Sequence, residues 1–356
     1  MNALLYFIIV ALLGYIGMYL IYKPQSDKYA QTLNFSYFML PVPYIYAFFV
    51  ITSIIAFFAL NNLDFIESLS FWRMILPLVL TPVIYASCTL LSEKSAFLVT
   101  LICVAITVCL QPLEDGNSYP ELPVWAFRII VIILATIYCF GAIINNFIPH
   151  TLLIPQMFVL LGLGGMAALS ATPVYIAVCA AILFGTIGGY LSINFYDVKI
   201  EIDNASAITL SYMVCALILM NLGELCFPSC IILTIVFWAE LLVALWRRVF
   251  VVRAGMLSES TNYYLAAQKL TIQALAFNIF KVCGVLMFLA WFQLYSVNNY
   301  SLLIVSLCIS LWLNGLLNTN GGGKQSLREI NQEFIANIKQ GIQETKDLLN
   351  KKHGDE

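Results

Sequence analysis

Residues 173–193 read PVYIAVCAAILFGTIGGYLSI, an apolar run that contains no charged residue. An α-helix rises about 1.5 Å per residue, so a helix of this length crosses the hydrocarbon core of a bilayer, which is about 30 Å thick. Similar runs occur along the rest of the chain, at 3–22, 41–60, 71–91, 95–111, 124–144, 151–170, 206–222, 228–246, 271–294 and 299–317. The sequence therefore predicts an all-α, polytopic integral membrane protein with about eleven transmembrane helices.

The composition supports the same class. Of the 356 residues, 62% are hydrophobic and only 10% are charged, whereas a soluble domain has about 25% charged residues. A chain with so few charges does not cover a water-facing surface, so membrane lipid is expected to surround most of it. The Lys and Arg residues are scattered over short loops, which is unlike a nucleic-acid-binding surface.

The distribution of basic residues predicts the orientation in the membrane. The loop after residue 246 contains Arg247, Arg248, Arg253 and Lys269, and basic loops stay on the cytoplasmic side. Counting helices backwards from this loop places the N-terminus outside and the C-terminus inside. The acidic loop at 114–121, which has no Lys or Arg, then falls outside, in agreement with this assignment.

The chain divides into a transmembrane domain at 1–320 and a tail at 321–356 that begins with a Gly-Gly-Gly linker. Apolar residues recur at helical spacing over 324–351, which predicts a cytosolic amphipathic helix. Such a helix lies on the membrane or on the protein's own loops, or it docks a protein partner. Cys226 and Cys230 flank a short loop, and the sequence leaves open whether they form a disulfide.

Three stretches resemble one family of membrane transferases. Residues 23–28 read KPQSDK, and the family's first cytoplasmic loop reads DxPxxRK. Residues 194–206 read NFYDVKIEIDNAS and resemble the family's NFPPAKIFLGDSG without a gap. Residues 239–248 read AELLVALWRR, where the family has Asp, six residues and Arg-Arg. The chain is therefore similar to the polyprenyl-phosphate N-acetylhexosamine-1-phosphate transferases.

This resemblance implies a function at the bacterial inner membrane, in the synthesis of cell-envelope glycans. Members of the family move a sugar-1-phosphate from a UDP-sugar to polyprenyl phosphate and use Mg²⁺ to bridge the diphosphate. Catalytic roles then fall on Asp203 and Glu240, and Glu93 joins Asp203 as a metal ligand. The residues expected to contact the substrates are Asn194, Lys199, Asn204, Arg247 and Arg248.

The sequence departs from the family at most of its catalytic motifs. Glu93 stands alone where the family has paired aspartates, and Asn145-Asn146 replaces a loop that contains carboxylates. Asn204 aligns with the family's aspartate, while Asp203 lies one residue away. Two functions are therefore left open: a divergent transferase, or a catalytically dead homologue that serves as a membrane scaffold or binds lipid phosphate. Simpler roles are also open, such as a topology-setting lysine for Lys199 and an ion pair between Glu240 and Arg247.

A second, shorter resemblance points to a different function. Residues 148–155 read IPHTLLIP, and residues 195–199 read FYDVK. This pattern is similar to type IV prepilin peptidases, which carry an Asp shortly before Ile-Pro and a Gly-x-Gly-Asp-Val-Lys loop. Asp197 matches the second aspartate, but Ala142 stands near the place of the first. An aspartic peptidase needs two carboxylates, one as base and one protonated, so this function ranks second.

Overall fold

The computed structural model describes residues 7–20, 69–111, 123–146, 149–168, 174–193, 202–221, 227–250, 272–295 and 300–318. Within these ranges the fold is all-α, as predicted, and contains no β-strand. The helices are Phe7–Leu20, α3 (Leu69–Leu90), α4 (Glu93–Cys109), α5 (Val124–Asn145), α6 (Pro149–Ala168), α7 (Val174–Ile193), α8 (Asn204–Met220), α9 (Phe227–Phe250), α11 (Ile272–Tyr295) and α12 (Ser301–Asn318).

These helices coincide, to within a few residues, with the predicted apolar runs that fall inside the described ranges. The run at 41–60 and the tail helix at 324–351 lie outside the described residues, as does Cys226. Four described helices contain segments that are long and apolar enough to cross a membrane, namely Val124–Ile143, Ile176–Ile193, Phe227–Leu245 and Leu275–Tyr295. The chain is thus a membrane protein by its apolar helices, while the count of eleven spans and the orientation remain predictions.

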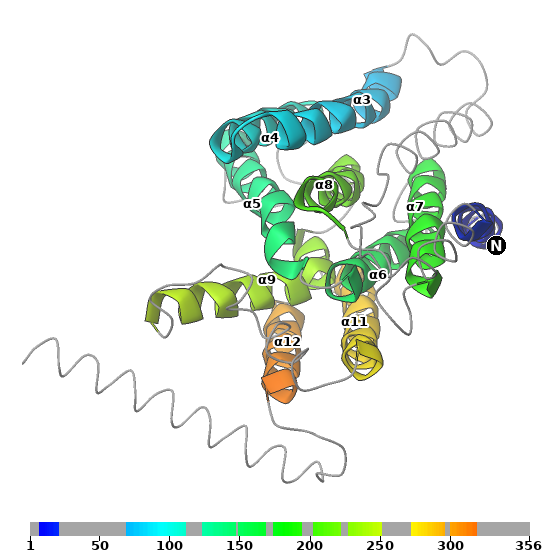
Figure 1. Cartoon of the computed structure of the whole chain (residues 1–356), viewed down its shortest axis with the longest axis vertical. Helices are drawn as coiled ribbons and strands as arrows, with labels where there is room; N and C mark the ends of the chain where they lie inside the picture. Colours follow the sequence, from blue (N-terminus) through cyan, green and yellow to red (C-terminus); the bar gives the residue numbers. More distant parts are fainter. Residues whose placement is uncertain are drawn as a thin grey trace, which may run out of the picture.

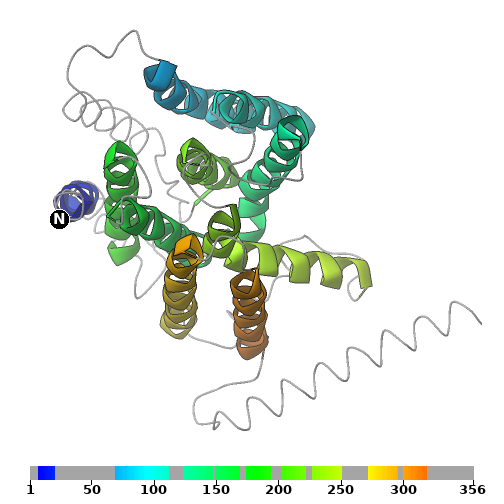
Figure 2. The same cartoon turned by 180° about the vertical axis from the view of Figure 1, so that it is seen from behind.

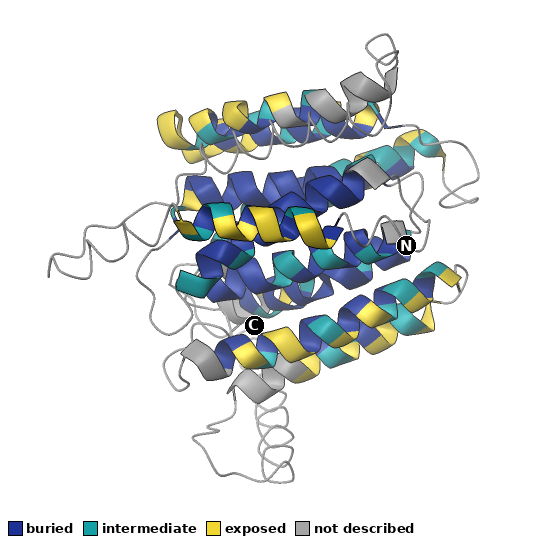
Figure 3. Cartoon of the chain, turned by 90° about the vertical axis from the view of Figure 1, so that its right-hand side faces the viewer, coloured by how far each residue is buried: buried dark blue, intermediate teal, exposed yellow. Residues whose placement is uncertain are grey.

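Helix α8 lies in the interior of the bundle. Its residues are buried without interruption from Ala205 to Leu219, and α3, α4, α5, α6 and α7 contact it. Both views down the bundle show α8 enclosed by its neighbours (Figures 1 and 2). Exposed residues gather on the outer helices and buried ones on the middle helices (Figure 3). A helix that is apolar all round is suited to such a central position.

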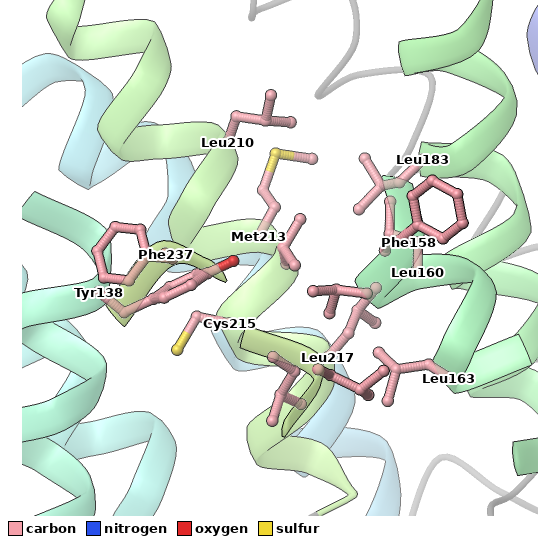
Figure 4. Close-up of a cluster of buried hydrophobic side chains, with 14 of the residues drawn as sticks. Tyr138, Phe158, Leu160, Leu163, Leu183, Leu210, Met213, Cys215, Leu217 and Phe237 are labelled. Carbon is pink, nitrogen blue, oxygen red and sulfur yellow. The ribbon is translucent and has the colours of Figure 1, made fainter. Parts of the chain in front are cut away.

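Leucine, methionine and aromatic side chains fill the space around α8. In Figure 4, Met213 and Leu217 of α8 lie toward Leu163 of α6 and Leu183 of α7. On the other side of α8, the rings of Tyr138 in α5 and Phe237 in α9 pack with their centroids 4.6 Å apart.

A few hydrogen bonds between side chains join the helices inside this apolar core. The Thr107 hydroxyl of α4 and the Tyr212 hydroxyl of α8 share a hydrogen bond of 2.8 Å. Gln156 Nε2 of α6 donates to Ser211 Oγ of α8 at 2.5 Å. Polar pairs of this kind hold helices together in membranes, where lipid removes much of the hydrophobic drive for association.

The helix Phe7–Leu20 packs against α7 through glycines. A methyl group on Gly185 of α7 would overlap the backbone carbonyl of Ala11, and one on Gly189 would lie 2.7 Å from the carbonyl oxygen of Tyr15. On the opposite helix, a methyl group on Gly14 would lie 3.0 Å from the carbonyl oxygen of Ile182. The two backbones therefore approach closely enough that only glycine fits, as in small-residue packing between membrane helices.

We predict that Gly185→Ala lowers the free energy of unfolding by about 1–3 kcal/mol, because the added methyl group overpacks this contact. Gly188→Ala is the matched control, since its methyl group would meet only ordinary contacts at 3.5 Å and beyond. The measurement is reversible unfolding in mixed micelles followed by circular dichroism. Equal stability of the two variants would contradict the close approach of the helices.

Candidate functional site

Polar residues gather at one end of the bundle, where three described helices begin. Only two residues separate the end of α3 from the start of α4, and α6 starts soon after the end of α5. Helix α8 starts at the same end, because Asn146, the C-cap of α5, donates a hydrogen bond of 2.6 Å from Nδ2 to the carbonyl oxygen of Ile202. We call this region, formed by residues 92–94, Asn146, His150 and residues 202–204, the polar end.

Asp203 begins helix α8 as its N-cap residue. Its backbone is extended, with φ of −73° and ψ of 161°, and its Oδ1 atom accepts a hydrogen bond of 3.3 Å from the backbone N–H of Ser206. This geometry satisfies one of the N–H groups that a helix leaves unpaired at its start. The carboxylate that the sequence assigns to catalysis and metal binding therefore also has a structural role.

The carboxylate of Asp203 lies within electrostatic range of the end of helix α3. It interacts electrostatically with the hydroxyl of Tyr85 and the thiol of Cys88. Both side chains lie near the end of α3, which places the start of α8 against that end of the bundle. Asp203 is only partly buried, and Asn204 beside it is exposed, so the start of α8 is open to a ligand.

His150 is the most enclosed polar residue of the polar end. It lies in the first turn of α6, its side chain is 1% exposed, and neither ring nitrogen has a hydrogen-bond partner. Buried polar groups are normally hydrogen-bonded, so the imidazole has donor and acceptor capacity that the described residues do not use. Nothing in the sequence singles out His150 as a ligand, because it is a single histidine beside a proline.

Glu93 and Lys94 lie at the start of α4, and both are exposed. No interaction between Glu93 and Asp203 occurs in the described structure, although both residues belong to it. In those same ranges there is also no group of three or more His, Cys, Asp or Glu side chains that could hold a metal ion. The pairing of Glu93 with Asp203 around Mg²⁺ therefore remains a prediction, and we derive no chemical step through a metal.

Glu240 is completely buried in α9, whereas Asp203 caps the start of α8. A shared catalytic role for these two carboxylates stays a prediction. Arg247 and Arg248 belong to the last turn of α9, and their side chains lie outside the described part of the structure. Asn194, Lys199 and Asp197 also lie outside it, so their roles stay predictions.

Sequence reasoning missed the contribution of α3 to this region. Tyr85 and Cys88 lie inside a run that reads as an ordinary transmembrane helix. A weak signal was present, because a tyrosine followed by Ser87, Cys88 and Thr89 makes the last turn of the run more polar than its middle. The hydrogen bond between Asn146 and Ile202 had no such signal in the sequence, since it depends on how the helices pack against one another.

An apolar hollow lies elsewhere in the bundle, between α5, α8 and α9. Its volume is about 50 Å³, and its lining includes Tyr138, Leu219, Phe227 and Trp238. These residues offer few polar atoms, so the hollow is suited to packing or to hydrocarbon and not to polar chemistry.

Comparison with known protein families finds no family that matches this chain, and no curated protein is similar to it.

We predict that Asp203→Ala lowers the free energy of unfolding by about 0.5–2 kcal/mol, because the N-cap hydrogen bond of α8 is lost. Asp203→Asn is the matched control, since asparagine caps a helix equally well without the charge. Chemical unfolding in detergent measures both. If Asp203→Asn lowers the free energy of unfolding as much as Asp203→Ala, the negative charge of Asp203 near Tyr85 and Cys88 contributes more to stability than the N-cap hydrogen bond.

Proposed function

We propose that this protein binds a phosphate-bearing lipid at the polar end of its bundle. The observation that carries the proposal is the gathering of three helix N-termini, those of α4, α6 and α8, at that end. Each N-terminus has unpaired N–H groups and a partial positive charge, which favour phosphate. The unpaired imidazole of His150 adds a donor for a phosphate oxygen.

The resemblance to the sugar-1-phosphate transferases supports polyprenyl phosphate as the lipid and a UDP-sugar as a second ligand. In that view Asn204 contacts the phosphate, and Asn194, Lys199, Arg247 and Arg248 supply further contacts. Binding is favoured over transfer, because the described carboxylates of the polar end are only Glu93 and Asp203, and the described residues contain no group of three or more His, Cys, Asp or Glu side chains that could hold a metal ion. An active transferase would require Mg²⁺ bound by Glu93 and Asp203. It would also require Glu240 as a second catalytic group.

We further propose the topology that this function needs. Eleven transmembrane helices, with the N-terminus outside, place the polar end on the cytoplasmic face of the bacterial inner membrane. The support is the basic loop with Arg247, Arg248, Arg253 and Lys269, together with the acidic loop at 114–121. Polyprenyl phosphate and UDP-sugars meet at that face in the family that the chain resembles. The tail at 324–351 then lies in the cytosol, where it is free to dock a protein partner.

The test compares binding of undecaprenyl phosphate with binding of undecaprenol, which has the same chain without the phosphate. We expect the wild-type protein to bind the phosphate more tightly. Asn204→Glu should weaken binding of the phosphate about fivefold, the effect of about 1 kcal/mol of charge repulsion near a surface. The variant should keep its fold, because an acidic residue in the first turn of α8 favours the helix dipole. Native mass spectrometry measures both affinities.

Asn204→Gln is the matched control, since it changes the same exposed position without adding charge. Equal binding of undecaprenyl phosphate and undecaprenol by the wild-type protein would reject the proposal. Assaying UMP release from a panel of UDP-sugars with Mg²⁺ separates the two versions of the function. Lipid-dependent release identifies an active transferase, and phosphate binding without release supports the binding role.

A peptidase function is the second candidate, and the hydrogen bond between Asn146 and Ile202 favours it. That bond joins the two loops in which type IV prepilin peptidases carry their aspartates. One observation opposes this alternative. Ala142, near the place of the first aspartate, has no carboxylate and is completely buried. It predicts that the protein cleaves a prepilin substrate and that Asp197→Ala stops the cleavage, as judged by gel mobility. A wild-type protein that cleaves no prepilin would eliminate this candidate.

A further inference from the structure

Helix α11 presents a phenylalanine-rich face to its surroundings. The helix contacts α6, α9 and α12, and the rest of its surface is exposed. The large apolar side chains on this side are 49–65% exposed, and they are Phe277, Phe280, Val285, Phe288 and Phe292. We call this set the α11 face. Because α11 contains an apolar span at Leu275–Tyr295, the α11 face is expected to contact lipid.

A lysine interrupts this apolar face. Lys281 is exposed and lies six residues after the first residue of the span Leu275–Tyr295, which corresponds to about 9 Å along the helix axis. A charged side chain at such a depth is rare and costly, and most such residues face the protein interior. Lys281 faces outward instead, so its charge needs a partner outside the bundle.

The side chain of Lys281 extends toward the N-terminal end of α11. Its Nζ atom lies 4.1 Å from the ring centroid of Phe277, one helical turn earlier. This direction follows from helix geometry, because Cα–Cβ bonds tilt toward the N-terminus. The long apolar stem thereby lies along the helix while the ammonium group approaches the membrane surface.

The aromatic ring satisfies only part of the ammonium group. A lysine has three N–H donors and no acceptor, and the face of Phe277 attracts the cation without accepting a full hydrogen bond. No carboxylate pairs with Lys281 in the part of the chain that the structure describes. The phosphate groups of lipid headgroups supply negatively charged oxygen atoms at this end of the helix.

We propose that the ammonium group of Lys281, positioned over the ring of Phe277, binds the phosphate of an anionic phospholipid in the leaflet at the N-terminal end of α11. Charge complementarity carries the choice of lipid, because the phosphate of a zwitterionic lipid is already paired with its own cation. The acyl chains of the lipid would lie along the phenylalanines of the α11 face. This site is on the lipid-facing surface, so its test does not depend on phosphate binding at the polar end.

The experiment uses the full-length protein in phosphatidylcholine nanodiscs that contain a phosphatidylglycerol with a photoreactive group near its headgroup. After illumination, mass spectrometry measures the cross-link yield on peptides of the α11 face. We expect Lys281→Met to lower this yield about fivefold, since one lysine near the membrane surface contributes about that factor to anionic lipid binding. Lys281→Arg should retain the yield, because it keeps the charge.

Lys94→Met is the matched control, since it removes another exposed lysine near a helix start and should leave the yield on α11 unchanged. Thermal unfolding in the same nanodiscs establishes that each variant is folded. An unchanged yield in Lys281→Met would overturn the proposal. A yield in Lys281→Arg as low as that in Lys281→Met would overturn it as well, because the positive charge would then not account for the binding.

Discussion

The enclosure of α8 is the constraint on which the rest of the bundle depends. A helix that contacts lipid needs only an apolar surface, but a helix surrounded by others needs neighbours that match its shape on every side. Helices α3 to α7 all contact α8, and two of those contacts include hydrogen bonds, through Tyr212 and Ser211. Because α8 is fixed in this way, its first residues are fixed too. The position of Asp203 against α3, and that of Ile202 against Asn146, therefore follow from the packing of the core.

The sequence predicted which residues form helices better than it predicted how they pack. Uncharged runs such as 173–193 indicate helices because a membrane leaves the backbone few other ways to satisfy its polar groups. The same runs do not show which helix is central. Residues 204–220 contain no charged residue, and 124–145 contain only Arg128, yet α8 is enclosed, while α5 exposes Ile129, Ile133 and Trp125. That difference depends on contacts between helices far apart in the sequence, and the composition of one run does not contain it.

The candidate site shows the same division. An aspartate just before an apolar run is typical of a helix start, and the structure gives Asp203 that position. Its proximity to Tyr85 and Cys88 was not predictable, since it requires the start of α8 to lie beside the end of α3. Lys281 was missed for another reason. In the sequence, a lysine inside an apolar run is only a minor interruption. Its role depends on whether its side chain faces the protein interior or the lipid, which the run does not show.

The contact between Phe7–Leu20 and α7 has a consequence for how the chain is made. Ala11 meets Gly185, which leaves the ribosome about 170 residues later, and at about 5–20 residues per second this takes roughly 10–35 s. During that time the first helix has no partner helix for this surface. The glycine surface of α7 therefore becomes available late, and the helix Phe7–Leu20 has to remain in the membrane on its own apolarity until α7 arrives.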